Sequence, residues 1–183
     1  LYGPHGDGTC RVIIPQGAIV RLRRALVGLL PRESASKEAD SACLSVVGYP
    51  AWAVEDSDLV DRTLRRIRRE LGGHYGYKRF LRDGHQTVVE DESRLHYEPE
   101  ALSEFEGIES EWPLFLAFEL VTACCEERWD EARSWYTKLK KLAVQQNGDA
   151  LYPELYLVER SGIDDERRSP GSQRRIANTN LPL

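Results

Sequence analysis

Apolar residues recur three and four positions apart through much of the chain, the spacing that gathers side chains on one face of an α-helix. The first such run predicts a helix over residues 16–30, with Pro15 at its start and Pro31 beyond its end. A shorter apolar run, Cys10–Ile14, precedes it and has the pattern of a strand. The pattern therefore predicts an opening segment followed by helices.

Two further helices are predicted before the middle of the chain. Ser34 or Ser36 can cap a helix over residues 37–47, because either hydroxyl can accept a hydrogen bond from a free backbone N–H. A stronger pattern follows in residues 57–71, where Ser57 is the expected cap and a pair of glycines ends the helix. The predicted buried stripe of this third helix consists of Leu59, Val60, Leu64, Ile67 and Leu71.

The second half of the chain predicts two more helices and then loses helical periodicity. Residues 112–125 are apolar on nearly all sides, which indicates a helix inside the core. Residues 129–144 are amphipathic, and Asn147-Gly148 is expected to mark the end of that helix. Beyond it lie the string LYPELYLVE and a polar tail.

A long segment without helical periodicity, residues 73–111, separates these two groups of helices. Segments of this length are usually functional or disordered, and disordered segments are poor in aromatic residues. We therefore expect an ordered loop whose aromatic faces and charged edges suit the docking of a carbohydrate or a protein. The aromatic residues of this segment and its flank are Tyr75, Tyr77, Phe80, Tyr97, Phe105 and Trp112.

Composition places bounds on the fold and on the partners. At 183 residues and 41% hydrophobic content, the chain is long enough for one core, and therefore for one domain or part of one. Its net charge of −5 is mild and its charges are interspersed, which argues against a nucleic-acid partner. No apolar run approaches the ~18 residues of a membrane span. The chain contains no methionine, so we expect it to be a piece of a longer protein.

No motif in the sequence predicts metal, nucleotide or redox chemistry. The four cysteines form no CxxC pair and no zinc-like spacing with histidine, so free thiols in a reducing cytosol are expected. His85 and His96 lack the paired spacing of a metal site, and no glycine-rich phosphate loop is present. We predict no cofactor, no metal ligand and no catalytic residue.

Seven strings, in order along the chain, resemble segments of the regulatory α and β subunits of phosphorylase kinase: LPRESASKEAD, GYPAWAVED, YGYKRFLRDGHQT, EDESRLHYEPEAL, FEGIESEWPLF, LYPELY and SPGSQRR. The resemblance covers residues 1–175 and does not distinguish α from β. It implies a regulatory, non-catalytic piece of the assembly that phosphorylates glycogen phosphorylase and promotes glycogen breakdown. The implied partners are the catalytic kinase subunit, the other regulatory subunit and calmodulin. The implied location is the cytoplasm, with a prenyl anchor holding full-length family members at the cell membrane.

The N-terminal half of that family is similar in turn to the glucoamylases, the glycoside hydrolases of family 15. This similarity implies an all-α fold, a partial (α/α)6 toroid with long irregular loops at one end. On that fold, residues 1–15 form an opening segment and residues 73–111 a pocket-side loop. Residues 16–72 and 112–146 form helices, and residues 147–183 form a loop and a polar tail.

The same similarity implies candidate residues of a sugar pocket or interface. The string RFLRD occupies the place of a loop at the mouth of the glucoamylase pocket, which marks Arg79, Arg82, Asp83 and, at the following helix, Trp112. Arginine can donate several hydrogen bonds to sugar hydroxyls, and an indole ring can stack on a pyranose. The alternative is that the arginines only tie the loop to itself through salt bridges with neighbouring carboxylates.

Glu109 and Glu111 are two further candidates, because glycoside hydrolysis needs a pair of carboxyl groups. Two glutamates just before a helix more often interact with its N-terminal dipole, so we do not predict catalysis. The resemblance places the glucoamylase acid upstream of this region and the base just beyond Leu183. A glucoamylase-like hydrolase or a sugar-binding module, with an oligosaccharide as its ligand, is the alternative function.

Two basic amphipathic stretches begin at Arg21 and Arg62. Calmodulin binds basic helices that have an apolar face, so both stretches are candidate calmodulin ligands. The alternative is that each is a toroid helix whose leucines are buried and whose charges lie in water. Burial of the apolar faces distinguishes these two interpretations.

Overall fold

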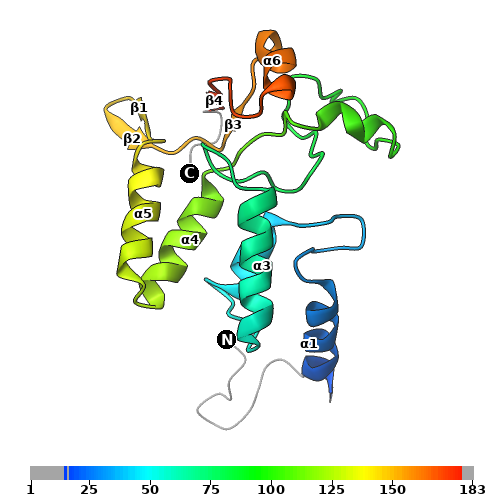
Figure 1. Cartoon of the computed structure of the whole chain (residues 1–183), viewed down its shortest axis with the longest axis vertical. Helices are drawn as coiled ribbons and strands as arrows, with labels where there is room; N and C mark the ends of the chain where they lie inside the picture. The colour runs from blue at the N-terminus through cyan, green and yellow to red at the C-terminus, as the bar shows by residue number, and fades with distance from the viewer. Residues whose placement is uncertain (1–14, 16, 179–183) are drawn as a thin grey trace.

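The computed structural model describes residue 15 and residues 17–178 (Figure 1). Helix predominates in this part of the chain, as expected, but four short strands are also present, so the prediction of a purely α-helical fold is too simple. The strand predicted at Cys10–Ile14 lies outside the described residues. The α-helices are α1 (Ala18–Leu29), α2 (Leu44–Val47), α3 (Ser57–Glu70), α4 (Leu114–Cys125), α5 (Trp129–Lys140) and α6 (Ile163–Arg168).

Short 3₁₀ turns and strands fill much of the remainder. The turns are η1 (Ser41–Cys43), η2 (Ala101–Phe105) and η3 (Arg160–Gly162). The strands are β1 (Val144–Gln146), β2 (Asp149–Leu151), β3 (Leu155–Leu157) and β4 (Ile176–Asn178), and they form two antiparallel pairs, β1 with β2 and β3 with β4.

Helix α3 follows the predicted pattern closely. Leu59 and Ile67 lie on its buried side, and Leu71 is buried immediately after its last turn. The cap is Asp56, not Ser57, because the Asp56 carboxylate accepts a hydrogen bond of 3.0 Å from the backbone N–H of Leu59. The periodic apolar stripe therefore located the helix correctly, and the cap prediction was wrong by one residue.

The helix predicted over residues 37–47 is correct only in its second half. Asp40 caps η1 by accepting from the N–H of Ala42 at 2.8 Å, and the regular turns run from there through α2. The Asp40 carboxylate also pairs with Lys37 at 2.7 Å. Ser34 and Ser36 do not cap a helix; their hydroxyls lie 2.9 Å from each other. A buried aspartate with two partners thus fixes the start of the helix.

The prediction for α5 extended the helix too far. The helix ends at Lys140, and Val144–Gln146 pairs with Asp149–Leu151 as a hairpin. Asn147 and Gly148 have φ values of 54° and 92°, the positive values that a two-residue hairpin turn requires. Asn-Gly is a preferred pair in such turns, so these residues close a hairpin and do not end a helix.

The main core lies between the helices and the loops. Helices α3, α4 and α5 stand side by side, and the strands, α6 and the 73–111 segment gather at the end where α3 stops and α4 starts (Figure 1). Ile67, Leu71, Tyr77 and Leu116 are almost fully buried in this core.

No helix among the described residues combines the length and apolar composition of a membrane span.

Backbone bridges attach the 73–111 segment to this core. The N–H of Tyr77 donates to the carbonyl of Trp112 at 3.2 Å, and the N–H of Trp112 donates back at 2.8 Å. The N–H of Glu111 donates in the same way to the carbonyl of Tyr156 at 2.9 Å. A Cβ on Gly73 would lie 2.1 Å from the Glu111 carboxyl carbon, so the chain needs glycine at that close approach. The segment is therefore an ordered part of the fold.

The two basic stretches have different surroundings. The apolar side of α3 is buried, which favours the interpretation of that stretch as an ordinary packed helix. In α1, by contrast, Ile19, Val20, Leu22 and Val27 are each more than half exposed.

We expect Ile67→Ala to destabilise the chain by roughly 2–5 kcal/mol, because it removes fully buried methyl groups and leaves a cavity. The matched control is Ile19→Ala, since Ile19 is 54% exposed. This substitution should change the free energy of unfolding by less than about 0.5 kcal/mol. Denaturant titration followed by circular dichroism measures both. Equal losses in the two variants would contradict the described packing of α3.

Candidate functional site

The structure brings Arg79, Asp83 and Trp112 together, three of the residues marked by the sequence. Arg79 donates two hydrogen bonds to the Asp83 carboxylate, from Nε at 2.6 Å and from Nη2 at 2.8 Å. Its guanidinium carbon lies 5.0 Å from the centre of the Trp112 ring, in cation–π range. Burial works against the charge of Arg79, but the hydrogen bonds and charge of Asp83 outweigh it and raise the pKa of Arg79. The group is therefore a fixed cation against an aromatic face.

Arg82 points to a different partner. Its φ of 62° places the backbone in the left-handed region, and its N–H donates to the Glu109 carboxylate at 2.9 Å. Its guanidinium pairs with Glu38 at 2.6 Å, on the rim of an open concavity of about 850 Å³. Arg82 therefore ties the loop to a segment before α2, whereas the ion pair of Arg79 with Asp83 lies within the loop.

Glu109 and Glu111 are both buried, with exposed fractions of 1% and 5%. Lys78 lies 2.8 Å from the Glu109 carboxylate, and the N–H of Tyr75 donates to Glu111 at 2.7 Å. The partners of these two carboxylates are Lys78, the Tyr75 N–H and Arg175, and the interaction with the dipole of α4 stays a prediction. The two carboxylates balance buried positive groups.

Arg175 is the main partner that sequence reasoning missed. Its side chain is 3% exposed and lies 3.3 Å from both the Glu111 and the Glu166 carboxylates. It also donates to the backbone carbonyl of Glu109. The string SPGSQRR was visible in the sequence, but its two adjacent arginines carry no local signal of which one is buried.

Glu166 completes this buried cluster from the short helix α6. Its carboxylate accepts from the N–H of Gly171 at 2.8 Å and from the N–H of Gln173 at 3.0 Å. The turn after α6 is thereby held against α6, and Arg175 is positioned beneath the 109–111 segment. We call Arg175, Glu109, Glu111 and Glu166 the Arg175 cluster.

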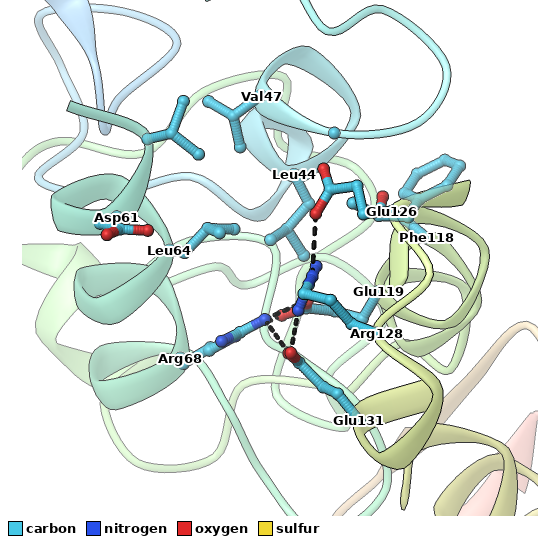
Figure 2. A pocket seen from close by; sticks show the side chains of 13 residues that line it. Leu44, Val47, Asp61, Leu64, Arg68, Phe118, Glu119, Glu126, Arg128 and Glu131 are labelled. Atoms are coloured by element: carbon cyan, nitrogen blue, oxygen red, sulfur yellow. Dashed lines mark hydrogen bonds and ion pairs between the residues drawn. The ribbon is translucent and has the colours of Figure 1, made fainter. Parts of the chain in front are cut away.

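A second polar group lines a cavity of about 330 Å³ between α2, α3 and α4 (Figure 2). Arg68 donates to Glu119 at 2.7 and 2.6 Å and to Glu131 at 2.8 Å. Arg128 lies between Glu131 and Glu126, so the charges alternate along the wall. Leu44, Val47, Leu64 and Phe118 form the apolar remainder. This arrangement joins α3, α4 and α5 through charge.

Tyr77 connects the cavity wall to the 73–111 segment. Its hydroxyl donates to Glu119 at 3.0 Å, and burial together with the neighbouring carboxylate raises its pKa. Hydrogen bonding to Glu119 raises the pKa of Arg68 as well. Tyr77 therefore stays protonated and Arg68 stays charged at neutral pH.

His85, His96 and Cys43 have structural surroundings. The His85 ring stacks on Trp112 with the ring centres 6.2 Å apart, and His96 lies 3.2 Å from Glu98 at the surface. Burial raises the pKa of the Cys43 thiol to about 12, which makes it unreactive. In the part of the chain that the structure describes, no group of three or more histidines, cysteines and carboxylates is placed to hold a metal ion.

Comparison with known proteins shows what the chain is similar to. No protein-family model matches the chain. Over all of its length, however, it is 42% identical to a Caenorhabditis elegans protein named probable phosphorylase b kinase regulatory subunit alpha. It is 38% identical, again over 100% of the chain, to the skeletal muscle isoform of that subunit from Oryctolagus cuniculus and to the liver isoform from Takifugu rubripes. Along its whole length the chain is thus similar to proteins named phosphorylase b kinase regulatory subunit alpha.

These three relatives are much longer than this chain, which spans 15% of the length of each. The strings that carry the resemblance supply the interior of the loop end. YGYKRFLRDGHQT contributes Tyr77, Arg79 and Asp83, and FEGIESEWPLF contributes both glutamates of the Arg175 cluster. The strings that resemble phosphorylase kinase subunits thus contain residues that organise this end of the fold.

We expect Arg175→Met to destabilise the chain by about 3–5 kcal/mol, because it leaves buried carboxylates without a positive partner. Arg174→Met is the matched control, since its side chain is exposed one position earlier. The Arg174→Met substitution should lower the free energy of unfolding by less than about 0.5 kcal/mol. Chemical denaturation compares the two, and a similar, small loss in both would show that the Arg175 cluster is dispensable.

Proposed function

We propose that this chain is part of a regulatory, non-catalytic subunit of phosphorylase kinase, which modulates the phosphorylation of glycogen phosphorylase in glycogen breakdown. The observation that carries the proposal is the match along the whole chain to proteins named as regulatory α subunits. A structural observation supports it: the candidate carboxylates Glu109 and Glu111 are only 1% and 5% exposed and are held in ion pairs with Lys78 and Arg175.

The proposed partners are the catalytic kinase subunit, a second regulatory subunit and calmodulin. Regulation would operate through interfaces whose contacts differ between a restrained and an active state of the kinase. For calmodulin, α1 is the better candidate of the two basic stretches, because its apolar side chains are the exposed ones. The proposed location is the cytoplasm, with a prenyl anchor elsewhere in the complete subunit.

For the fold, we propose that the chain is a slice of an (α/α)6 toroid of the glucoamylase type, divided into segments as the sequence suggested. Helices α4 and α5 form a packed hairpin joined by a short turn, the unit from which such toroids are built. The gathering of loops at one end of the helices is also typical of that architecture (Figure 1).

The regulatory proposal predicts a restraint on the kinase. The catalytic subunit assembled with the complete regulatory subunit should phosphorylate glycogen phosphorylase several-fold more slowly at low calcium than the catalytic subunit alone. Phosphate incorporation measures this rate, and a glucose-release assay on maltose should remain at background. Unchanged kinase rates together with release of glucose would favour the hydrolase instead.

Sugar binding without turnover is the second candidate, favoured by the contact of Arg79 with Trp112. If a sugar docks there, Arg79→Lys should weaken binding of maltose or acarbose by about tenfold. A lysine ammonium cannot donate the paired, planar hydrogen bonds that a guanidinium donates. Arg82→Lys is the control, since Arg82 pairs with Glu38 away from this ring. Calorimetry on the complete subunit measures these affinities. An absence of binding heat for the unaltered subunit would exclude a sugar site at Arg79 and Trp112.

A further inference from the structure

An apolar groove lies on the outer side of the α4–α5 hairpin. Leu120, Val121 and Cys124 of α4 and Trp129 and Tyr136 of α5 line a concavity of about 600 Å³. Trp129 is 60% exposed and Tyr136 is 51% exposed. Helix α5 stands at the edge of the helix group, with no described element packed on its outer side (Figure 1). Large exposed aromatics gathered in one groove are typical of an interaction surface.

Positive charge runs along one side of this groove. A second concavity of about 620 Å³ is lined by Arg133, Lys138 and Lys141, with Ser134 and Thr137 between them and Asp130 as its one carboxylate. Arg133 lines both concavities, so the apolar groove and the cationic strip are continuous across α5. Among the described residues, neither Arg133 nor Lys141 has a carboxylate within ion-pair distance.

The charge of this strip is opposite to that of the molecule. The chain carries a net charge of −5, and many of its other arginines and lysines are paired with acids. The C-terminal dipole of α5 accounts for basic residues in its last turn, such as Lys138. It does not account for Arg133, which lies near the start of the helix, or for the exposed rings beside it.

We propose that the outer surface of the α4–α5 hairpin docks an acidic amphipathic helix. Two packed antiparallel helices present a groove that fits a third helix, and helix-in-groove binding is a recurring mode of recognition. Helix α5 has 12 residues and is therefore ~18 Å long, enough to contact about three turns of the partner. This inference identifies a surface and the chemistry of its occupant, and it does not depend on the proposed sugar site or on kinase restraint.

The contacts follow from the order of side chains on α5. Apolar residues of the partner at positions i, i+3 or i+4, and i+7 would pack between Trp129 and Tyr136 on the α4 side. Carboxylates on the neighbouring flank of the partner would face Arg133 and Lys141. A basic helix would be repelled by the same strip, so the charges set the choice of partner.

Photocrosslinking in the assembled complex tests the proposal directly. Tyr136 is replaced by p-benzoylphenylalanine in the complete subunit, the complex is irradiated, and the crosslinked peptide is identified by mass spectrometry. The expected product is a segment with helical apolar spacing and an excess of aspartate and glutamate. No crosslink, or a crosslink to a basic or non-helical segment, would overturn the proposal.

Charge reversal provides the second measurement. Arg133→Glu combined with Lys141→Glu should lower the yield of that crosslink by about tenfold, because like charges would then face each other. The control is Arg65→Glu combined with Arg62→Glu on α3, which makes the same change in net charge at exposed positions of another helix. Circular dichroism confirms that both variants are folded. An equal loss in both pairs would show a general charge effect and reject the docking surface.

Discussion

The buried guanidinium of Arg175 is the interaction on which the irregular end of this fold depends. A cation removed from water is stable only where several acceptors surround it, and this one has the carboxylates of Glu111 and Glu166 and the carbonyl of Glu109. These groups come from a loop and from α6, which are far apart in the sequence. Their convergence orders a region that has little regular secondary structure of its own.

A chain of polar contacts carries this order into the helices. Tyr77 exchanges backbone hydrogen bonds with Trp112 and donates its hydroxyl to Glu119 in the middle of α4. Glu119 in turn binds Arg68 on α3. The helices and the loop end are therefore fixed relative to each other by charge as well as by apolar packing.

Sequence pattern predicted those features that depend on local spacing. The stripe of α3 and the apolar run of α4 place both helices within a few residues, whereas the boundaries set by Asp40 and Asn147-Gly148 were misjudged because side-chain capping and turn chemistry override helical periodicity. Resemblance pointed to Arg79, but no local pattern distinguishes buried Arg175 from exposed Arg174. That difference arises only when α6 folds back and supplies Glu166.

The close approach of Gly73 to Glu111 has a consequence for how the sequence of this fold can vary. The carboxylate occupies the space that any side chain at position 73 would need, and it is itself bound to Arg175. A side chain at position 73 therefore needs a change at Glu111 to make room, and a change at Glu111 removes a carboxylate partner from Arg175. The glycine-rich turn is thus coupled through Glu111 to a buried ion pair that lies a hundred residues further along the chain.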